Sequence, residues 1–266
     1  MYETFSIGNV TLPTFLTLPH RGSKPREIGV THVLDRGASV ATTESVLSTA
    51  ADYIDLWKFG WGTAYLDPGL RNKLALLADA GVGSCLGGTL LEIAWAQGKE
   101  REFLNWARDV GFRYVEVSRG VAPMPTEVKQ ELIRTAASWF EVLAEVGSKD
   151  PDSEPAPDLW ADEIASDLKA GARWVIAEGR ESGTVGLYRA DGSVREDVVA
   201  AAVRGGGTDR VLFEAPRKDQ QAWLIRKLGP EVNLANIALD DALALETLRR
   251  GLRADTFQMA QPPVPS

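Results

Sequence analysis

Glutamates recur at the carboxyl ends of short apolar runs along this 266-residue sequence. The runs have the length of buried strands, and the carboxyl ends of parallel strands lie together at one edge of a sheet. Several carboxylates at one edge cannot all ionise unless a cation joins them, and oxygen ligands without histidine suit Mg²⁺ better than Zn²⁺. The sequence therefore predicts a magnesium site, whose candidate ligands are Glu116, Glu145, Glu178 and Glu214.

A purely structural role for each of these glutamates stays open. Charged residues at strand ends often pair with a neighbour or cap the next helix. The pattern also includes other ionisable residues, with Asp35 ending the first predicted strand and Lys58 the second. The repetition along the chain is harder to explain by local pairing than any one residue is.

Glycine-rich turns follow three of the predicted strands, at residues 59–63, 87–89 and 179–186. Successive glycine N–H groups can face one anion, and a helix N-terminus adds partial positive charge. An arginine in such a turn can contact a phosphate or carboxylate through two N–H groups. The turns match no dinucleotide or nucleoside-triphosphate fingerprint, and a role in tight turns alone stays open. The residues predicted to bind the anion are Arg180, Gly183, Gly186, Gly88 and Thr89.

The elements that must position these residues repeat as strand, turn and amphipathic helix, with about 30 residues between strands. Strand interiors such as Trp174–Ala177 are continuously apolar, which indicates strands covered on both faces. The repeat predicts an α/β fold, a single (β/α)8 TIM-type barrel, with a doubly wound sheet as the alternative. The predicted strands are Gly29–Asp35, Tyr53–Lys58, Gly81–Leu86, Arg113–Ser118, Glu141–Val146, Arg173–Glu178, Arg210–Ala215 and Glu231–Asn236.

The predicted barrel domain covers residues 1–257, with an irregular lead-in over residues 1–28 that could form a hairpin. Residues 258–266 are predicted to be a flexible tail. Residues 150–157 and Gly205–Gly207 are predicted loops. Helices are expected at 44–51, 67–80, 90–97, 100–110, 127–139, 159–170, 194–204, 216–228 and 240–250.

The composition excludes several classes of protein. With 29 Lys and Arg against 37 Asp and Glu, the net charge is −8, and without a basic run we expect no nucleic-acid or anionic-membrane partner. Cys85 is the single cysteine and only two histidines occur, which excludes disulfides, thiolate clusters and polyhistidine zinc sites. Cys85 and His32 are predicted to be packed core residues. No secretory leader or transmembrane run is found, so we expect a soluble, cytoplasmic protein.

In their order and spacing, several motifs resemble the phosphosulfolactate synthase family, which includes plant heat-stress-associated relatives. The resemblance runs from Lys24 to Phe257, nearly the whole chain. Its most specific segments are Asp52–Asp55, Lys58–Thr63, Gly87–Glu92, Glu145–Asp150, Ala177–Gly183, Phe213–Pro216 with Gln220 and Gln221, and Val232–Ile237.

The resemblance implies magnesium-dependent addition of sulfite to phosphoenolpyruvate, the first step of one route to coenzyme M. Sulfite would attack carbon 3, negative charge would develop on the carboxylate as an enediolate, and an acid would protonate carbon 2. By resemblance Lys149 is the candidate acid. Lys58, Arg180 and Lys218 would neutralise phosphate, carboxylate or sulfite. The family also implies a homo-oligomer, such as a trimer.

One departure from the family pattern leaves the substrate open. Arg119 stands where the family usually has Asp or Asn, which changes the charge beside the predicted mouth. A lyase that adds another nucleophile, or uses another anionic acceptor, is therefore a second hypothesis. A non-catalytic barrel, like the stress-associated relatives, is a third. The retention of Lys58, Lys149 and Arg180 argues against the third, because a binding scaffold does not need that set.

Overall fold

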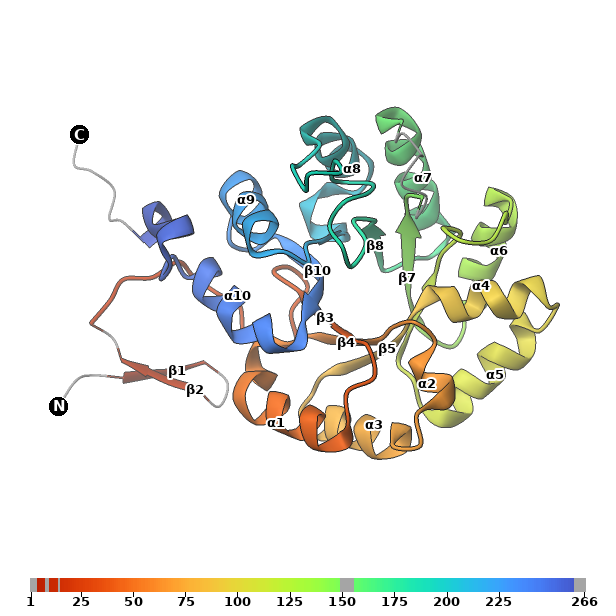
Figure 1. Ribbon diagram of the computed structural model, residues 1–266, viewed down its shortest axis with the longest axis horizontal. Coiled ribbons are helices and arrows are strands. Elements are labelled where there is room, and N and C mark those ends of the chain that lie inside the picture. The colour runs from red at the N-terminus through yellow and green to blue at the C-terminus, as the bar shows by residue number, and fades with distance from the viewer. Residues whose placement is uncertain (1–3, 8–9, 14, 149–155, 261–266) are drawn as a thin grey trace.

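The computed structural model describes residues 4–7, 10–13, 15–148 and 156–260, and its centre is a closed barrel of parallel strands (Figure 1). The barrel strands are β3 (Thr31–Asp35), β4 (Leu56–Phe59), β5 (Gly83–Leu86), β6 (Tyr114–Val117), β7 (Glu141–Val146), β8 (Trp174–Ala177), β9 (Val211–Glu214) and β10 (Asn233–Ala238). The last strand, β10, pairs with β9 on one side and β3 on the other. The sheet therefore closes on itself, which confirms the predicted barrel and excludes the doubly wound alternative.

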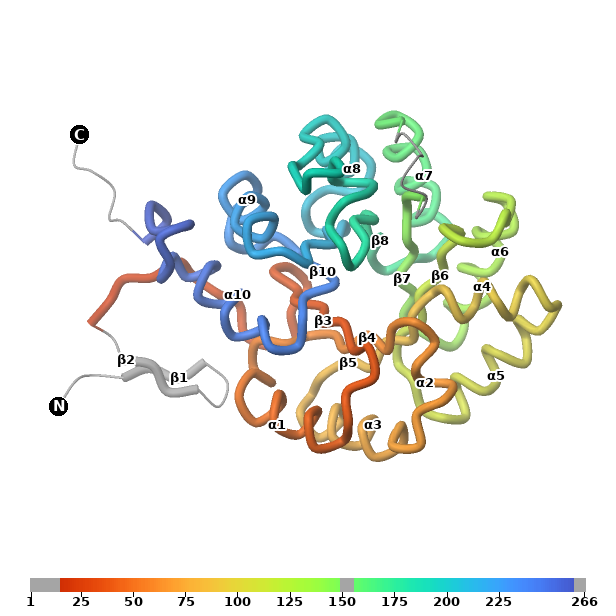
Figure 2. The backbone as a smooth tube through the Cα atoms, in the orientation of Figure 1, coloured from red at the N-terminus to blue at the C-terminus, as the bar shows by residue number. Residues whose placement is uncertain are grey.

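Helices surround this barrel, and the chain alternates between the two layers as it winds round (Figures 1 and 2). The helices are α1 (Val40–Ala50), α2 (Thr63–Leu66), α3 (Leu70–Asp79), α4 (Gly88–Ala96), α5 (Glu100–Val110), α6 (Thr126–Ala136), α7 (Pro157–Ala170), α8 (Glu196–Arg210), α9 (Lys218–Leu228) and α10 (Ala242–Arg249). The 3₁₀ helices are η1 (Ala51–Tyr53), η2 (Leu239–Asp241) and η3 (Ala254–Ala260). The short helix α2, which follows a glycine-rich turn, was not predicted.

The prediction of a loop at Gly205–Gly207 is wrong for Gly205 and Gly206, which are helical residues of α8, whereas Gly207 is non-helical. Gly205 is needed there for close packing, since a Cβ atom on it would lie 2.5 Å from the carbonyl oxygen of Ala161 in α7. Gly207 has φ 74° and ψ 169°, which is non-helical, so two helical segments of α8 meet there at a kink. A run of glycines therefore marks a helix–helix contact here.

Several strand boundaries also differ from the prediction, and two of them do so for a clear structural reason. The strand expected from Tyr53 starts at Leu56, because the preceding residues form η1. The last strand starts at Asn233 and extends to Ala238. Its pairing register with β3 shifts between Leu234 and Ile237, which is the signature of a bulge.

The two ends of the described chain bear on three further predictions. Strands β1 (Thr4–Ile7) and β2 (Val10–Pro13) pair antiparallel, as expected for a hairpin in the lead-in. Of the predicted tail, residues 258–260 lie in η3, and residues 261–266 lie outside the described residues. The predicted loop at 150–157 falls mostly outside them too, and its last residue, Pro157, begins α7.

Strand alternation explains how the barrel positions ionisable groups. Leu56 of β4 and Tyr114 of β6 belong to the apolar cluster inside the barrel. Two residues further along the same strands, on the same face, come Lys58 and Glu116. The barrel interior is thus apolar in its lower part and ionisable at the carboxyl ends of the strands. Within the described part of the chain, no helix is long and apolar enough to cross a membrane.

Candidate active site

A cavity of about 50 Å³ lies at the carboxyl ends of the barrel strands, large enough for an ion and a few waters. All four predicted metal ligands line it and are buried, and together they are called the carboxylate cluster: Glu116, Glu145, Glu178 and Glu214. They come from β6, β7, the residue after β8, and β9. Lys58, Arg180, Gly88 and Thr89 line the same cavity. The structure therefore brings together most of the residues that sequence reasoning selected.

Lys58 lies among the carboxylates rather than at the rim. Its Nζ atom is 2.9 Å from Glu116 Oε2, 3.9 Å from Glu145 Oε2 and 3.9 Å from Glu214 Oε1. The Lys58 side chain is only 9% exposed, so water screens these contacts weakly. One ammonium is thus shared by three carboxylates.

Glu116 is the carboxylate that this ammonium holds most firmly in its charged form. Burial alone would raise its pKa, but the charge of Lys58 and the contact with His32 outweigh burial and lower the pKa to about 2. The backbone N–H of Gly88, the first residue of α4, also donates to Glu116 Oε2 at 3.1 Å. Glu116 is therefore ionised at any physiological pH.

The pKa of Glu214 is shifted in the opposite direction from that of Glu116. Burial raises its pKa, the charge of Lys58 opposes that rise, and the charge of Glu145 adds to it. The backbone N–H groups of Gly179 and Arg180 donate to Glu214 Oε2 at 2.9 and 2.8 Å. The carboxylate is thus fixed in position while its charge is only partly balanced. Such a group gains stability from a further cation.

The donor set fits a magnesium ion. Among the described residues that line the cavity, four buried carboxylates face one buried ammonium, and Arg180 at the rim is 3.6 Å from Glu181. Asn236 adds a buried Oδ1 atom that has no hydrogen-bond partner. Hard oxygen donors with an excess of negative charge are what Mg²⁺ binds. The carboxylate cluster and Asn236 could hold such an ion.

Backbone strain is concentrated at this cavity. The described non-glycine residues with positive φ are Trp61 (54°), Arg180 (62°) and Asn236 (55°), and all three line it. Such conformations cost energy and persist at functional sites. Asn236 lies at the bulge in β10 and donates from Nδ2 to Glu214 Oε1. Sequence reasoning missed Asn236, although an asparagine in an apolar strand, a residue that tolerates this conformation, was a readable signal.

The glycine turns divide into two groups. Gly88 begins α4 beside the cavity, and a Cβ atom there would lie 2.3 Å from Ser118 Oγ, so only glycine allows the close approach. Gly183 and Gly186 do not line the cavity. A Cβ atom would meet the Gln220 side chain at Gly183 and the Glu178 carbonyl oxygen at Gly186. These two glycines shape the turn after β8, and substrate binding by them stays a prediction.

Of the two remaining predicted cations, one is described by the structure and does not line the cavity. Lys218 is half-exposed at the start of α9, and its Nζ lies 2.9 Å from Asp255 Oδ1 in η3. Lys149 lies outside the described residues, three positions beyond the end of β7. The proposed roles of both lysines stay predictions.

Asp35 and Arg119 have structural partners. Asp35 accepts hydrogen bonds from the backbone N–H groups of Gly37 and Ala38, at 2.7 and 2.6 Å, and fixes the loop after β3. Arg119 donates to both carboxylate oxygens of Glu163, at 2.9 and 2.7 Å. These contacts give Asp35 and Arg119 a structural role, of the kind that charged residues at strand ends often have.

Comparison with known proteins identifies the family of this chain. Residues 19–255 match the (2R)-phospho-3-sulfolactate synthase (ComA) family. The chain is 42% identical over 248 residues to the phosphosulfolactate synthase of Bacillus subtilis, covering 91% of this chain and 97% of that protein. It is 44% identical to that of Methanocaldococcus jannaschii, covering 86% and 94%. A distant relative is the protein HEAT-STRESS-ASSOCIATED 32 of Arabidopsis thaliana, 21% identical, with 80% and 83% covered.

Solved structures show the same fold at low identity. A 3-keto-L-gulonate-6-phosphate decarboxylase from Vibrio cholerae superimposes with a TM-score of 0.55 at 10% identity, covering 84% of this chain and 97% of that chain. A 3-hexulose-6-phosphate synthase gives 0.52 at 15% identity, covering 83% and 95%. The family match spans most of the chain, and the family's enzymes share over two fifths of its residues. The chain belongs to the (2R)-phospho-3-sulfolactate synthase family.

Proposed function

We propose that this protein catalyses the magnesium-dependent addition of sulfite to phosphoenolpyruvate, giving phosphosulfolactate. Family membership supports an enzyme of this kind. The observation that carries the proposal further is the position of Lys58, buried within 4 Å of three carboxylates at the barrel mouth. A packed core has no use for such a costly group of charges, whereas anion chemistry with a divalent cation does.

The reaction places distinct demands on the residues of the cavity. When bound, Mg²⁺ supplies charge stabilisation for a substrate carboxylate, on which negative charge grows as sulfite attacks carbon 3. The carboxylate cluster would hold the ion, with Glu116 fixed in its charged form by Lys58 and Gly88. Lys58 would also neutralise a substrate anion. Arg180, at the rim, is suited to a phosphate or carboxylate through two N–H groups.

Proton delivery to carbon 2 completes the addition. Lys149 is the proposed acid, on the strength of the family resemblance alone. A lysine beside other cations and a metal has a lowered pKa, which would favour proton donation near neutral pH.

An adduct assay tests the proposal. Purified protein is incubated with phosphoenolpyruvate, sulfite and Mg²⁺, and the products are identified by mass spectrometry. We expect the phosphosulfolactate mass from the wild type and its loss in Glu214→Gln, with Lys227→Met, at an exposed lysine of α9 that pairs with Glu196, as a control that retains activity. Consumption of phosphoenolpyruvate with another nucleophile, and not with sulfite, would favour the related-lyase hypothesis. No consumption with any anion would favour a non-catalytic barrel.

Two wider predictions accompany this function. We infer a cytoplasmic location from the sequence, and a homo-oligomer such as a trimer from the family resemblance. Sedimentation velocity measures the oligomeric state, and a monomer at all concentrations would contradict the second inference.

A further inference from the structure

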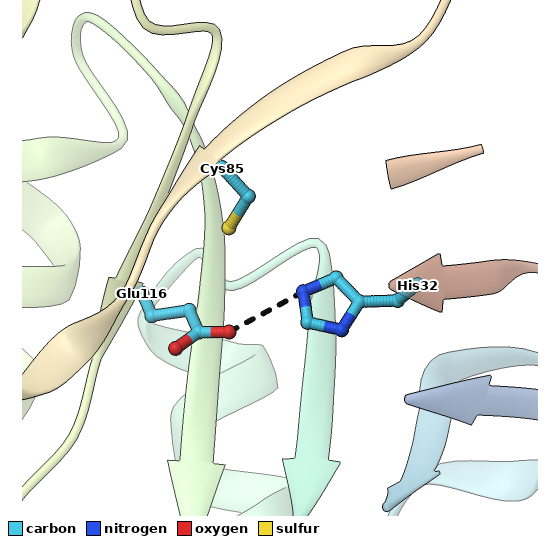
Figure 3. Close-up of side chains that lie close together, drawn as sticks. All are labelled: His32, Cys85 and Glu116. Carbon is cyan, nitrogen blue, oxygen red and sulfur yellow. Dashed lines mark ion pairs between the residues drawn. The ribbon is translucent and has the colours of Figure 1, made fainter. Parts of the chain in front are cut away.

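Three buried side chains of different chemistry meet inside the barrel below the cavity. His32 of β3, Cys85 of β5 and Glu116 of β6 point toward one another from three strands (Figure 3). One ligand atom from each lies within 4.8 Å of the others, and all three residues are 0% exposed. Nitrogen, sulfur and oxygen donors therefore share one small volume in the barrel interior.

The polar atoms of this group are not satisfied by the protein. Neither ring nitrogen of His32 has a hydrogen-bond partner, and neither has Glu116 Oε1. His32 Nε2 lies 3.4 Å from Glu116 Oε1, which is longer than a typical hydrogen bond. Buried polar atoms are normally paired, so an unpaired set aimed into one volume indicates an absent partner. A metal ion is a partner that a histidine lone pair, a cysteine sulfur and a carboxylate oxygen can share.

The charge states suit a metal ion. A neutral imidazole such as that of His32 offers one nitrogen lone pair to a metal ion. Cys85 is fully buried and supplies one sulfur ligand atom. On metal binding the thiol would release its proton to solvent and the thiolate would bind the ion. The thiolate would add one negative charge beside the Glu116 carboxylate, whose own charge Lys58 partly balances.

We propose that His32, Cys85 and Glu116 form a binding site for a divalent transition metal of the zinc or cobalt class. Thiolate and imidazole ligands favour these ions over Mg²⁺. Ligand atoms around tetrahedral zinc are about 3.3–3.8 Å apart, which rotation of the three side chains can reach. Glu116 would bind through Oε1 while Oε2 keeps its contacts with Lys58 and Gly88. A water from the cavity would complete the coordination.

Cobalt titration tests this site without measuring turnover. Metal-free protein is titrated with Co²⁺ and followed by absorbance for a thiolate-to-cobalt charge-transfer band. Cys85 is the single cysteine of the chain, so such a band can come from no other residue. We expect a band that saturates at one ion per chain and disappears when one equivalent of Zn²⁺ is added.

Variants separate the site from surface binding. Cys85→Ser, which is close in size, should abolish the band, and His32→Gln should raise the Kd for Co²⁺ by about tenfold or more. The matched control is His20→Ala, because His20 is the other histidine and is exposed. Circular dichroism checks that each variant is folded.

The proposal would be overturned by the absence of a charge-transfer band in wild-type protein at saturating Co²⁺. A folded His32→Gln variant with unchanged Kd would also overturn it. Neither result depends on sulfite addition, so this proposal and the proposed enzymatic function can fail separately.

Discussion

Replacing Lys58 by methionine removes the ammonium that lies 2.9 Å from Glu116 and 3.9 Å from both Glu145 and Glu214. Methionine keeps most of the volume, so the change isolates the charge. We expect the Lys58→Met variant to be less stable than the wild type at pH 7, because a buried carboxylate loses its counterion.

The size of the effect follows from Glu116. Burial raises its pKa, yet Lys58 with His32 brings it from an ordinary 4.5 down to about 2. A tenfold change in proton affinity corresponds to about 1.4 kcal/mol, so the charged form of Glu116 contributes about 3 kcal/mol to folding. A lowered carboxyl pKa gives stability that is fully present above pH 4.5 and is lost as the pH falls through about 2. Lys58 is the largest of the influences that lower this pKa, so the deficit of Lys58→Met should be on the order of 3 kcal/mol at pH 7 and should shrink as falling pH protonates Glu116.

Equilibrium urea unfolding of both proteins with chelator, at pH 7, 4 and 3, measures this difference. Lys218→Met is the matched control, since that lysine pairs with Asp255 at the surface, and it should cost no more than about 1 kcal/mol. Equal free energies of unfolding for wild type and Lys58→Met at pH 7 would refute the reasoning. So would a deficit that does not change with pH.

Four further predictions follow from the site and its surroundings. Chelation of divalent ions should abolish phosphosulfolactate formation and added Mg²⁺ should restore it; full activity in metal-free buffer would remove the ion from the mechanism. Lys149→Ala should lower kcat by about 10²–10⁴-fold with little change in the binding of phosphoenolpyruvate, as steady-state kinetics and a binding titration would show. Lys129 is fully buried, with its Nζ atom 2.6 Å from Asp167 Oδ2, so the Lys129→Met variant should lose about 3–5 kcal/mol of unfolding free energy in urea. A loss below about 1 kcal/mol would contradict the pairing. Arg119→Ala should leave the preference among anionic nucleophiles unchanged, because the guanidinium is held by Glu163; a changed preference in competition assays would place Arg119 in the site.

The barrel and the carboxylate cluster could be predicted because both depend on local order along the chain. Apolar runs such as Val211–Glu214 reveal a strand and its carboxyl end together, and parallel pairing brings those ends to one mouth. Strand alternation then fixes which face Glu116 occupies. No long-range contact needs to be known for either step.

The residues that were missed or misplaced depend on contacts between distant segments. Lys218 pairs with Asp255, and nothing near Lys218 in the sequence shows that η3 packs there. The glycines of α8 were predicted to form a loop, because Ala161 of α7, against which Gly205 packs, lies far from them along the chain. Asn236 owes its place to a register shift in β10, which apolar periodicity does not reveal. His32 and Cys85 were correctly expected to be buried, but their approach to Glu116 required the closed barrel.

Nuclear magnetic resonance of phosphoenolpyruvate labelled with ¹³C at carbon 3 tests the central claim most directly. With wild-type protein, sulfite and Mg²⁺, the account predicts that the alkene signal of carbon 3 is replaced by that of a saturated carbon bonded to sulfur, while the phosphate stays attached. Omission of sulfite or of Mg²⁺ should leave the alkene signal in place. An alkene signal that persists in the complete mixture, or a labelled product that carries no carbon–sulfur bond, would contradict the account.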